Sequence, residues 1–213
     1  MPDRGRLIAI EGIDGSGKTS QVQLLAAPGE LAGSITVTHE PGSTALGVEL
    51  RSLLLNRDLP AVAERTEALL MAADRAQHMA EVVAPALAAG RWVVTDRFSG
   101  STLAYQGYGR GLDLGDLGRL VEWATGGLAP DLNVLVDVPV AVARARRAGD
   151  DEDRLESLDQ SFHERVRAGY LELAATDGER WVVVDGEGDI LEVAGRLKAA
   201  VVDRLGPLPS EAP

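Results

Sequence analysis

Five short apolar runs, separated by long stretches of helix-forming composition, constrain the fold of this chain more than any other feature. The runs are Leu7–Ile10, Ile35–Thr38, Trp92–Thr95, Leu132–Val136 and Trp181–Val184. Each run is almost continuously apolar, which is typical of strands that are covered on both faces. Strands that alternate with helices favour a doubly wound parallel sheet with right-handed crossovers. We therefore expect an α/β fold in which helices flank a five-stranded parallel sheet.

The segments between the runs predict helices near residues 17–27, 45–55, 63–89, 114–125, 139–148, 157–176 and 189–205. Pro28 and Gly29 should end the first helix, and Pro85 should kink or restart the long third one. A chain of 213 residues is most simply one domain. We expect that domain to span residues 1–205, followed by a disordered tail at 206–213.

A phosphate-binding motif follows the first apolar run. Residues Gly12–Thr19 fit the pattern G-x-x-x-x-G-K-[ST] at every fixed position, in the strand, loop and helix context that the motif requires. Glycines let backbone N–H groups surround phosphate oxygens, and the helix N-terminus adds its positive end. The motif predicts that Lys18 reaches the β- and γ-phosphates of a nucleoside triphosphate and that Thr19 ligates Mg²⁺. The remaining phosphate-binding positions of the loop are Gly12, Ile13, Asp14, Gly15, Ser16 and Gly17.

Composition limits the other partners and the compartment. The formal charge of −12 gives no support to a nucleic-acid-binding role. The absence of cysteine excludes disulfides and thiolate metal sites, and it suits a reducing compartment. No run of about 18 apolar residues is present, so we expect no membrane span and a cytoplasmic protein.

Ligands bind beyond the carboxyl ends of the strands in such a sheet, and three residue clusters fit this position. One contains Glu40-Pro41-Gly42 and is followed by Arg51. Another combines Asp74-Arg75 with Asp96-Arg97-Phe98, Thr102 and Tyr105-Gln106-Gly107. The third runs from Arg144 to Arg154 and combines arginines with a glycine- and acid-rich loop. Acids and arginines at strand ends suit a site that handles phosphates and Mg²⁺.

Taken in order, these motifs resemble the thymidylate kinase family, whose members phosphorylate dTMP to dTDP. The phosphate-binding loop, Glu40-Pro41-Gly42, Asp96-Arg97-Phe98, Tyr105-Gln106-Gly107 and Asp153-Arg154-Leu155-Glu156 all match, over roughly residues 5 to 200. The resemblance implies a P-loop nucleoside monophosphate kinase-like fold, ATP and Mg²⁺ as cofactors, dTMP as acceptor and a homodimer. Helices from about 63 to 89 and 101 to 125 carry enough apolar surface for such an interface.

The resemblance also implies residue roles. Arg97 would bind the dTMP phosphate, with Arg51 as a second clamp, while Asp14 and Tyr105 would face the sugar. The base and its surroundings would involve Glu40, Pro41, Met71, Arg75, Thr102 and Gln106. Because Gly15 is not basic, the chain looks like the bacterial form that supplies arginines from a lid, here about residues 146–156. Arg147 and Arg154 are then the lid candidates for catalysis beside Lys18, Arg97 and Asp14, and Arg144 would contact ATP.

Departures from the family pattern keep alternatives open. Met71 stands where the family usually stacks a phenylalanine on thymine, and a polarizable thioether can also cover a base face. A related nucleotide or nucleoside kinase with another acceptor is therefore one alternative. A P-loop domain that only binds nucleotide and acts as a switch is another, although the second phosphate site formed by Asp96 and Arg97 argues against it.

Overall fold

The computed structural model describes residues 4–26, 33–149 and 153–209. All five predicted strands are present, as β1 (Leu7–Glu11), β2 (Ile35–His39), β3 (Trp92–Asp96), β4 (Leu132–Asp137) and β5 (Trp181–Asp185). They form one parallel sheet in the order β2-β3-β1-β4-β5, which confirms the predicted α/β fold. Each strand extends one residue beyond its apolar run, because the polar residue at its end continues the ladder.

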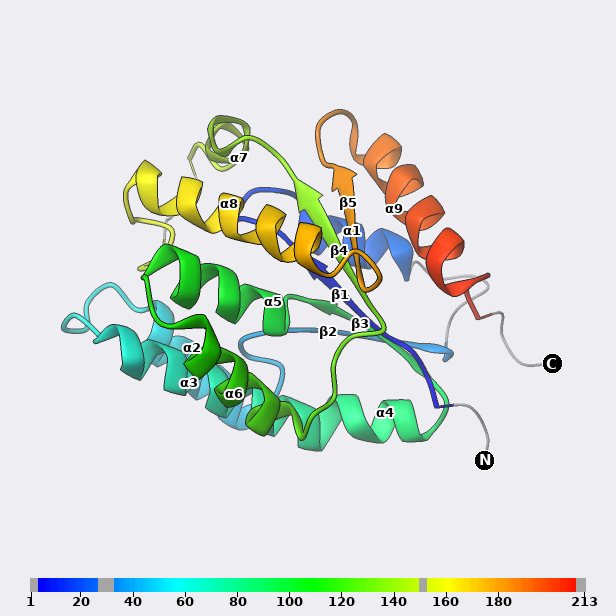
Figure 1. The fold of residues 1–213 in the computed structure, drawn as a ribbon, viewed down its shortest axis with the longest axis horizontal. Helices are drawn as coiled ribbons and strands as arrows, with labels where there is room; N and C mark the ends of the chain where they lie inside the picture. The colour runs from blue at the N-terminus through cyan, green and yellow to red at the C-terminus, as the bar shows by residue number, and fades with distance from the viewer. Residues whose placement is uncertain (1–3, 27–32, 150–152, 210–213) are drawn as a thin grey trace.

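Two helical layers cover the sheet, as Figure 1 shows. On one face, Ile8 and Ile10 of β1 pack with α1 (Lys18–Leu25) and α9 (Ile190–Leu205). On the other face, Leu7 and Ala9 of the same strand pack with the helices that follow residue 78. Successive side chains of a strand point to opposite faces, so a strand buried on both sides must be apolar throughout. This explains the continuous apolar runs of the central strands, whereas the edge strand β2 alternates apolar and polar residues and is only partly buried.

The expected helix 63–89 is divided into three parts. It consists of α3 (Glu64–His78), the π-helical turn η1 (Met79–Val83) and α4 (Ala84–Ala88). Pro85 lies in the first turn of α4, where its missing N–H is tolerated. The predicted restart of the helix at Pro85 is thus confirmed, with the wider π turn directly before it.

The other predicted helices are present with small boundary shifts. They are α2 (Ala45–Leu55), α6 (Leu114–Thr125), α7 (Val140–Arg146) and α8 (Gln160–Thr176), in addition to α1 and α9. Helix α8 begins later than expected because the Asp159 carboxylate caps it, accepting from Phe162 N at 2.7 Å. The list of helices predicted from the sequence did not include α5 (Ser99–Thr102) or the π-helical segment η2 (Leu103–Gly109). The helical surface proposed for the dimer did include residues from about 101.

Several predictions concern residues outside the described ranges. They include the helix stop at Pro28 and Gly29, the centre of the lid at 150–152, and the tail beyond residue 209. Leu208, in the described part of the expected tail, packs against the core beside α9. None of the helices in the described ranges has the length and apolarity needed to cross a membrane.

Candidate active site

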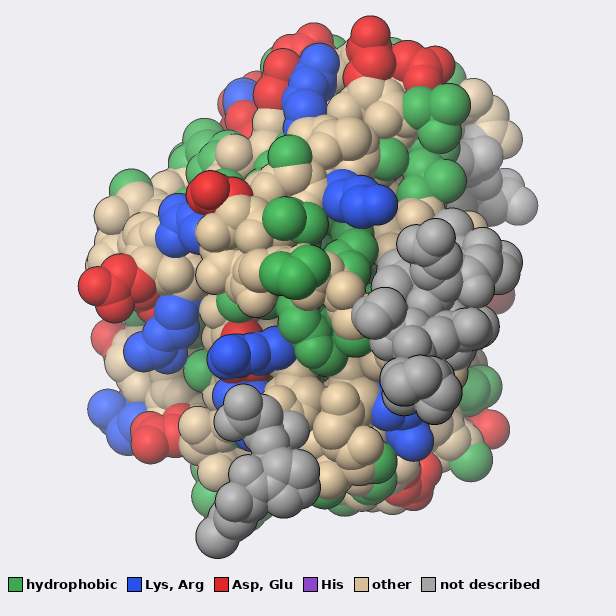
Figure 2. Space-filling model, turned by 90° about the vertical axis from the view of Figure 1, so that its right-hand side faces the viewer, with side chains coloured by type: hydrophobic (Ala, Val, Ile, Leu, Met, Phe, Trp, Pro, Cys, Tyr) green, Lys and Arg blue, Asp and Glu red, His purple; other side chains and the backbone are tan. Residues whose placement is uncertain are grey.

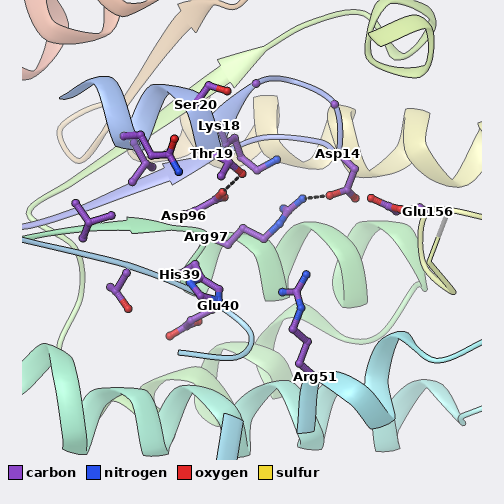
Figure 3. A pocket seen from close by; sticks show the side chains of 16 residues that line it. Asp14, Lys18, Thr19, Ser20, His39, Glu40, Arg51, Asp96, Arg97 and Glu156 are labelled. Atoms are coloured by element: carbon purple, nitrogen blue, oxygen red, sulfur yellow. Dashed lines mark hydrogen bonds and ion pairs between the residues drawn. The ribbon is translucent and has the colours of Figure 1, made fainter. Parts of the chain in front are cut away.

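The loop that follows β1 and the carboxyl ends of β2 and β3 line a cavity of about 720 Å³. Its lining also includes the first turns of α1, Arg51 of α2 and Glu156. In Figure 3, Lys18 and Arg97 point into this space, and Arg51 approaches from the helix opposite the loop. Parallel strands present their carboxyl ends at one edge of the sheet, so these residues meet although they are distant in sequence.

Lys18 is buried at the start of α1 and its Nζ donates to the carbonyl of Ile13 at 2.8 Å. Burial and the adjacent Arg97 guanidinium lower the pKa of Lys18 to about 8. The loop thus positions the Lys18 ammonium group in the space that it encloses. Backbone N–H groups of such a loop can also bind anions.

Thr19 and Asp96 form an oxygen-rich pair beside Lys18. Thr19 Oγ1 donates to Asp96 Oδ2 at 2.5 Å. Asp96 Oδ1 is buried and has no hydrogen-bond partner among the described residues. A hydroxyl and a carboxylate are ligands that Mg²⁺ prefers, so these residues fit the metal that the sequence motif predicts at Thr19.

Gly15 is in a left-handed conformation, with φ of 81°, and closely approaches α7. An added Cβ would lie 2.3 Å from the carbonyl oxygen of Ala143 and 2.9 Å from Cδ of Arg147. No side chain fits this position without movement of α7. Arg147 occupies the space instead and lies 2.7 Å from Glu156 in an ion pair. The packing therefore leaves no room for a basic side chain at Gly15 and places the Arg147 side chain beside the loop.

Arg97 has a left-handed backbone, with φ of 71°, directly after β3. Its N–H donates to the Ile10 carbonyl at 3.0 Å, and its carbonyl accepts from Thr95 Oγ1 at 2.8 Å. Positive φ is costly for a residue with a Cβ and persists where surrounding contacts fix it. The conformation turns the Arg97 side chain toward the phosphate-binding loop.

The Arg97 guanidinium holds several groups of the site together. It donates to the Gly12 carbonyl at 3.0 Å, Tyr170 OH at 3.2 Å and Tyr105 OH at 3.1 Å, and it forms an ion pair with Asp14 (Figure 3). Tyr105 OH also donates to Asp14 Oδ2 at 2.6 Å. Burial alone would raise the pKa of Asp14, but the charges of Arg97 and Lys18 outweigh it and hold this pKa well below its ordinary value.

A second cavity, of about 110 Å³, adjoins the first. All ten residues that the resemblance assigns to the acceptor line it. They are Asp14, Glu40, Pro41, Arg51, Met71, Arg75, Arg97, Thr102, Tyr105 and Gln106. Asp153, Leu155 and Glu156 close the cavity from the lid end. The structure therefore brings residues from six separate segments of the chain into one small space.

Arg75 is 2% exposed, and its guanidinium is fixed by protein acceptors. It donates to Glu40 Oε2 at 2.9 Å, Thr102 Oγ1 at 2.8 Å and the Phe98 carbonyl at 2.9 Å. Glu40 Oε1 lies 2.8 Å from Nδ1 of the buried His78. These contacts make Arg75 a rigid wall of the second cavity.

The predicted lid arginines lie in different places. Arg144 and Arg147 line a third cavity, of about 390 Å³, beside Ile13 and Asp14. Arg154 does not line any of these three cavities in the described part of the chain. Its Nη2 contacts Glu67 Oε2 at 3.2 Å instead, because this fully buried carboxylate requires cationic partners. In this structure the Arg154 guanidinium is therefore held by Glu67 outside the three cavities, and its expected catalytic role stays a prediction.

Sequence reasoning missed the buried carboxylate of Glu11. It accepts from the N–H groups of Phe98 and Ser101 at 3.0 and 3.2 Å, and from Tyr170 OH at 3.1 Å. Burial raises the pKa of Glu11. The contacts fix the start of α5 next to Arg97. An acidic residue at the end of the first apolar run was the available signal.

Arg146 and Glu156 were also left without a role by the sequence. Arg146 donates to the carbonyls of Ser16 at 3.3 Å and Gly186 at 2.9 Å, which links α7 to the phosphate-binding loop. Glu156 lines all three cavities described above. Burial and the charges of Asp153 and Asp14 raise the pKa of Glu156. Its position as the last residue of Asp-Arg-Leu-Glu was the only sequence signal.

Comparisons with known proteins agree with these observations. A family model described as thymidylate kinase matches residues 10–196. A thymidylate kinase from Nostoc sp. (strain PCC 7120 / SAG 25.82 / UTEX 2576) is 49% identical over 188 residues, which cover 86% of this chain and 89% of that protein. Another from Carboxydothermus hydrogenoformans is 49% identical over 197 residues, with coverages of 92% and 96%.

A solved structure is similar as well. The crystal structure of thymidylate kinase from Ehrlichia chaffeensis aligns with a TM-score of 0.75 and 29% sequence identity. The alignment covers 93% of this chain and 99% of that chain.

Proposed function

The chain belongs to the thymidylate kinase family, and on this basis we propose that it transfers the γ-phosphoryl group of ATP to dTMP, giving ADP and dTDP. One observation carries the proposal: the two adjoining cavities share Asp14, Glu40, Arg51, Arg97 and Glu156. One cavity holds the phosphate-binding loop and the other holds the predicted acceptor residues. A phosphate group bound in one cavity and a phosphate group bound in the other would both lie next to Arg97.

The donor side uses the loop and α1. Backbone N–H groups and Lys18 bind the ATP phosphates, and Arg144 and Arg147 approach from α7 and the residue after it. Thr19 and Asp96 would hold Mg²⁺, because the free Asp96 oxygen and the Thr19 hydroxyl are suitable ligands. When bound, Mg²⁺ neutralises charge on the phosphate oxygens.

The acceptor side uses the second cavity. Arg97 and Arg51 bind the phosphate of dTMP, while Asp14 and Tyr105 face the sugar. Met71, Arg75, Thr102 and Gln106 surround the base, next to Glu40 and Pro41. A phosphate oxygen is already a good nucleophile, so the protein needs no general base. Catalysis then depends on alignment and on cations that stabilise charge in the transition state.

A coupled assay with ATP and a panel of acceptors tests this proposal. We expect turnover of dTMP above dUMP, dCMP, dGMP and thymidine. Arg97→Ala should lower transfer by at least about a hundredfold and leave ATP binding nearly unchanged. Activity with another acceptor but not with dTMP would favour the altered specificity that Met71 suggests. ATP binding without transfer to any acceptor would favour a nucleotide-binding switch.

We also propose that the protein is a cytoplasmic homodimer without a nucleic-acid partner. Leu69 of α3 and Leu114 and Trp123 of α6 are 58%, 40% and 82% exposed, on two helices that pack together. Exposed apolar side chains on adjacent helices support a protein interface. On the face shown in Figure 2, Lys and Arg side chains are separated by neutral and acidic ones rather than forming a basic stripe. The lack of cysteine suits the cytoplasm.

A further inference from the structure

Glu67 of α3 is fully buried and lies directly behind the acceptor cavity without lining it. Its Oε1 accepts from Gln106 Nε2 at 3.0 Å and Arg110 Nε at 3.3 Å. Its Oε2 accepts from Arg110 Nη2 at 2.9 Å and Arg154 Nη2 at 3.2 Å. One carboxylate therefore joins residues of η2, the residue after η2 and the lid end.

Arg154 connects this carboxylate to α2 as well. Its Nε donates to the Leu54 carbonyl at 2.7 Å, and its backbone N–H donates to the Leu55 carbonyl at 3.1 Å. Leu55 and Leu155, the neighbours of these contacts, both line the acceptor cavity. The Arg154 side chain is 14% exposed, so most of it is desolvated in this position. Docking of Arg154 thus fixes one wall of the cavity from behind.

Gln106 forms part of another wall. Gln106 is 1% exposed, and its amide nitrogen donates to Glu67. Because the amide group is planar, this contact also fixes the orientation of the amide oxygen. Two cavity walls, one from η2 and one from the lid end, therefore depend on the same buried charge. If Glu67 loses its charge, Arg154 loses its buried partner and Gln106 loses the acceptor that orients it.

We propose that Glu67 is a positioning residue, which assembles the acceptor-base pocket by holding Gln106 and the Arg154 end of the lid together. Arg154 then acts on acceptor binding rather than on the transferred phosphoryl group. This inference rests on the proposed function for the identity of the acceptor. It separates Arg154 from Arg147, which lies beside the phosphate-binding loop.

Steady-state kinetics of Glu67→Gln and Arg154→Lys test the proposal. Glutamine keeps the shape of Glu67 without its charge, and lysine keeps the charge of Arg154 without the fork that reaches both Leu54 and Glu67. We expect each variant to raise KM for dTMP by about tenfold, with kcat and KM for ATP changed by less than about threefold. The double variant should raise KM for dTMP by about as much as the more impaired single variant and no further, since both substitutions act through one contact.

Arg110→Gln is the matched control. Arg110 contacts the same carboxylate but lines neither of the two cavities, so its loss should leave KM for dTMP within about twofold of the wild type. An equal effect of Arg110→Gln would mean that Glu67 only balances charge, which overturns the proposal. A fall in kcat for Arg154→Lys with unchanged KM for dTMP would also overturn it, because Arg154 would then act on the phosphates.

Two further measurements keep the outcome clear. Thermal unfolding identifies a variant that does not fold, and if Glu67→Gln fails to fold, the comparison of Arg154→Lys with Arg110→Gln decides. A wild-type protein that does not phosphorylate dTMP would overturn the proposed function. The positioning role is then judged by calorimetry of dTMP binding, where equal affinities of wild type and Arg154→Lys would overturn it.

Discussion

At the scale of single residues, the ionisation of Lys18 should make ATP binding depend on pH. Because burial and Arg97 lower its pKa to about 8, Lys18 loses its charge as the pH rises through this value. ATP favours the charged form, so affinity should be about tenfold weaker at pH 9 than at pH 7. Calorimetric titration with ATP at pH 7, 8 and 9 measures the change. Lys18→Arg remains charged over this range and should show little slope; equal slopes in both proteins would contradict the assignment.

Asp74 should make stability depend on pH. It is 1% exposed, and its Oδ1 accepts from Gly42 N at 3.0 Å. Its Oδ2 has no hydrogen-bond partner in the described ranges. Burial and the charge of Glu40 raise the Asp74 pKa from 3.8 to about 6. The folded state therefore binds a proton more tightly than the unfolded state, and stability from this group is lost as pH rises from about 4 to 6.

Asp74→Asn removes this titration. The difference in free energy of unfolding between the variant and the wild type should shift in favour of the variant by roughly 1–3 kcal/mol from pH 4 to pH 7. Urea denaturation at the two pH values measures the difference. Asp116→Asn, at an exposed ion pair with Arg119, is the control for loss of a surface carboxylate, and the gain for Asp74→Asn should exceed its effect. A constant difference between wild type and Asp74→Asn would show that the carboxyl does not titrate in this window.

At the element scale, the contact between α8 and η2 depends on glycine. A Cβ added to Gly169 of α8 would lie 2.4 Å from Cγ and 2.6 Å from Cβ of Tyr108, atoms near the backbone that cannot swing away. Gly169→Ala should therefore lower the free energy of unfolding by about 1–3 kcal/mol. Gly195→Ala in α9 is the control, because an added Cβ there meets no described atom within 4 Å. It should raise stability by about 0.5–1 kcal/mol, and equal shifts in denaturation midpoint would contradict the packing explanation.

The central strands β1, β3 and β4 were predictable because burial on both faces leaves a nearly continuous apolar run in the sequence. Their last residues were not, since Asp96 continues the ladder opposite Ile10 despite its charge. Helix α5 was missed because Ser99-Gly100-Ser101 has weak helix propensity, and its start is fixed by the distant carboxylate of Glu11. Local composition cannot report such a contact.

The gathering of the acceptor residues was predictable from ordered motifs, since each motif follows a strand or lies on a helix facing the same edge. The position of Arg154 was not. Its partner Glu67 lies 87 residues away in the sequence, and nothing in the local pattern distinguishes an arginine that binds phosphate from one that binds a buried carboxylate. Only the packing of the lid end on α2 and α3 decides between them.

For the whole molecule, the proposed homodimer makes a prediction about Trp123. This residue is 82% exposed on α6, and burying an aromatic side chain is a large contribution to an interface. Trp123→Glu would place a charge in that interface, so the variant should be monomeric where the wild type is dimeric. Sedimentation velocity at equal protein concentrations measures this shift. Leu191→Glu in α9 is the matched control, since Leu191 is also exposed, at 67%, on another part of the surface. A monomeric wild type, or a shift in both variants, would contradict an interface formed by α3 and α6.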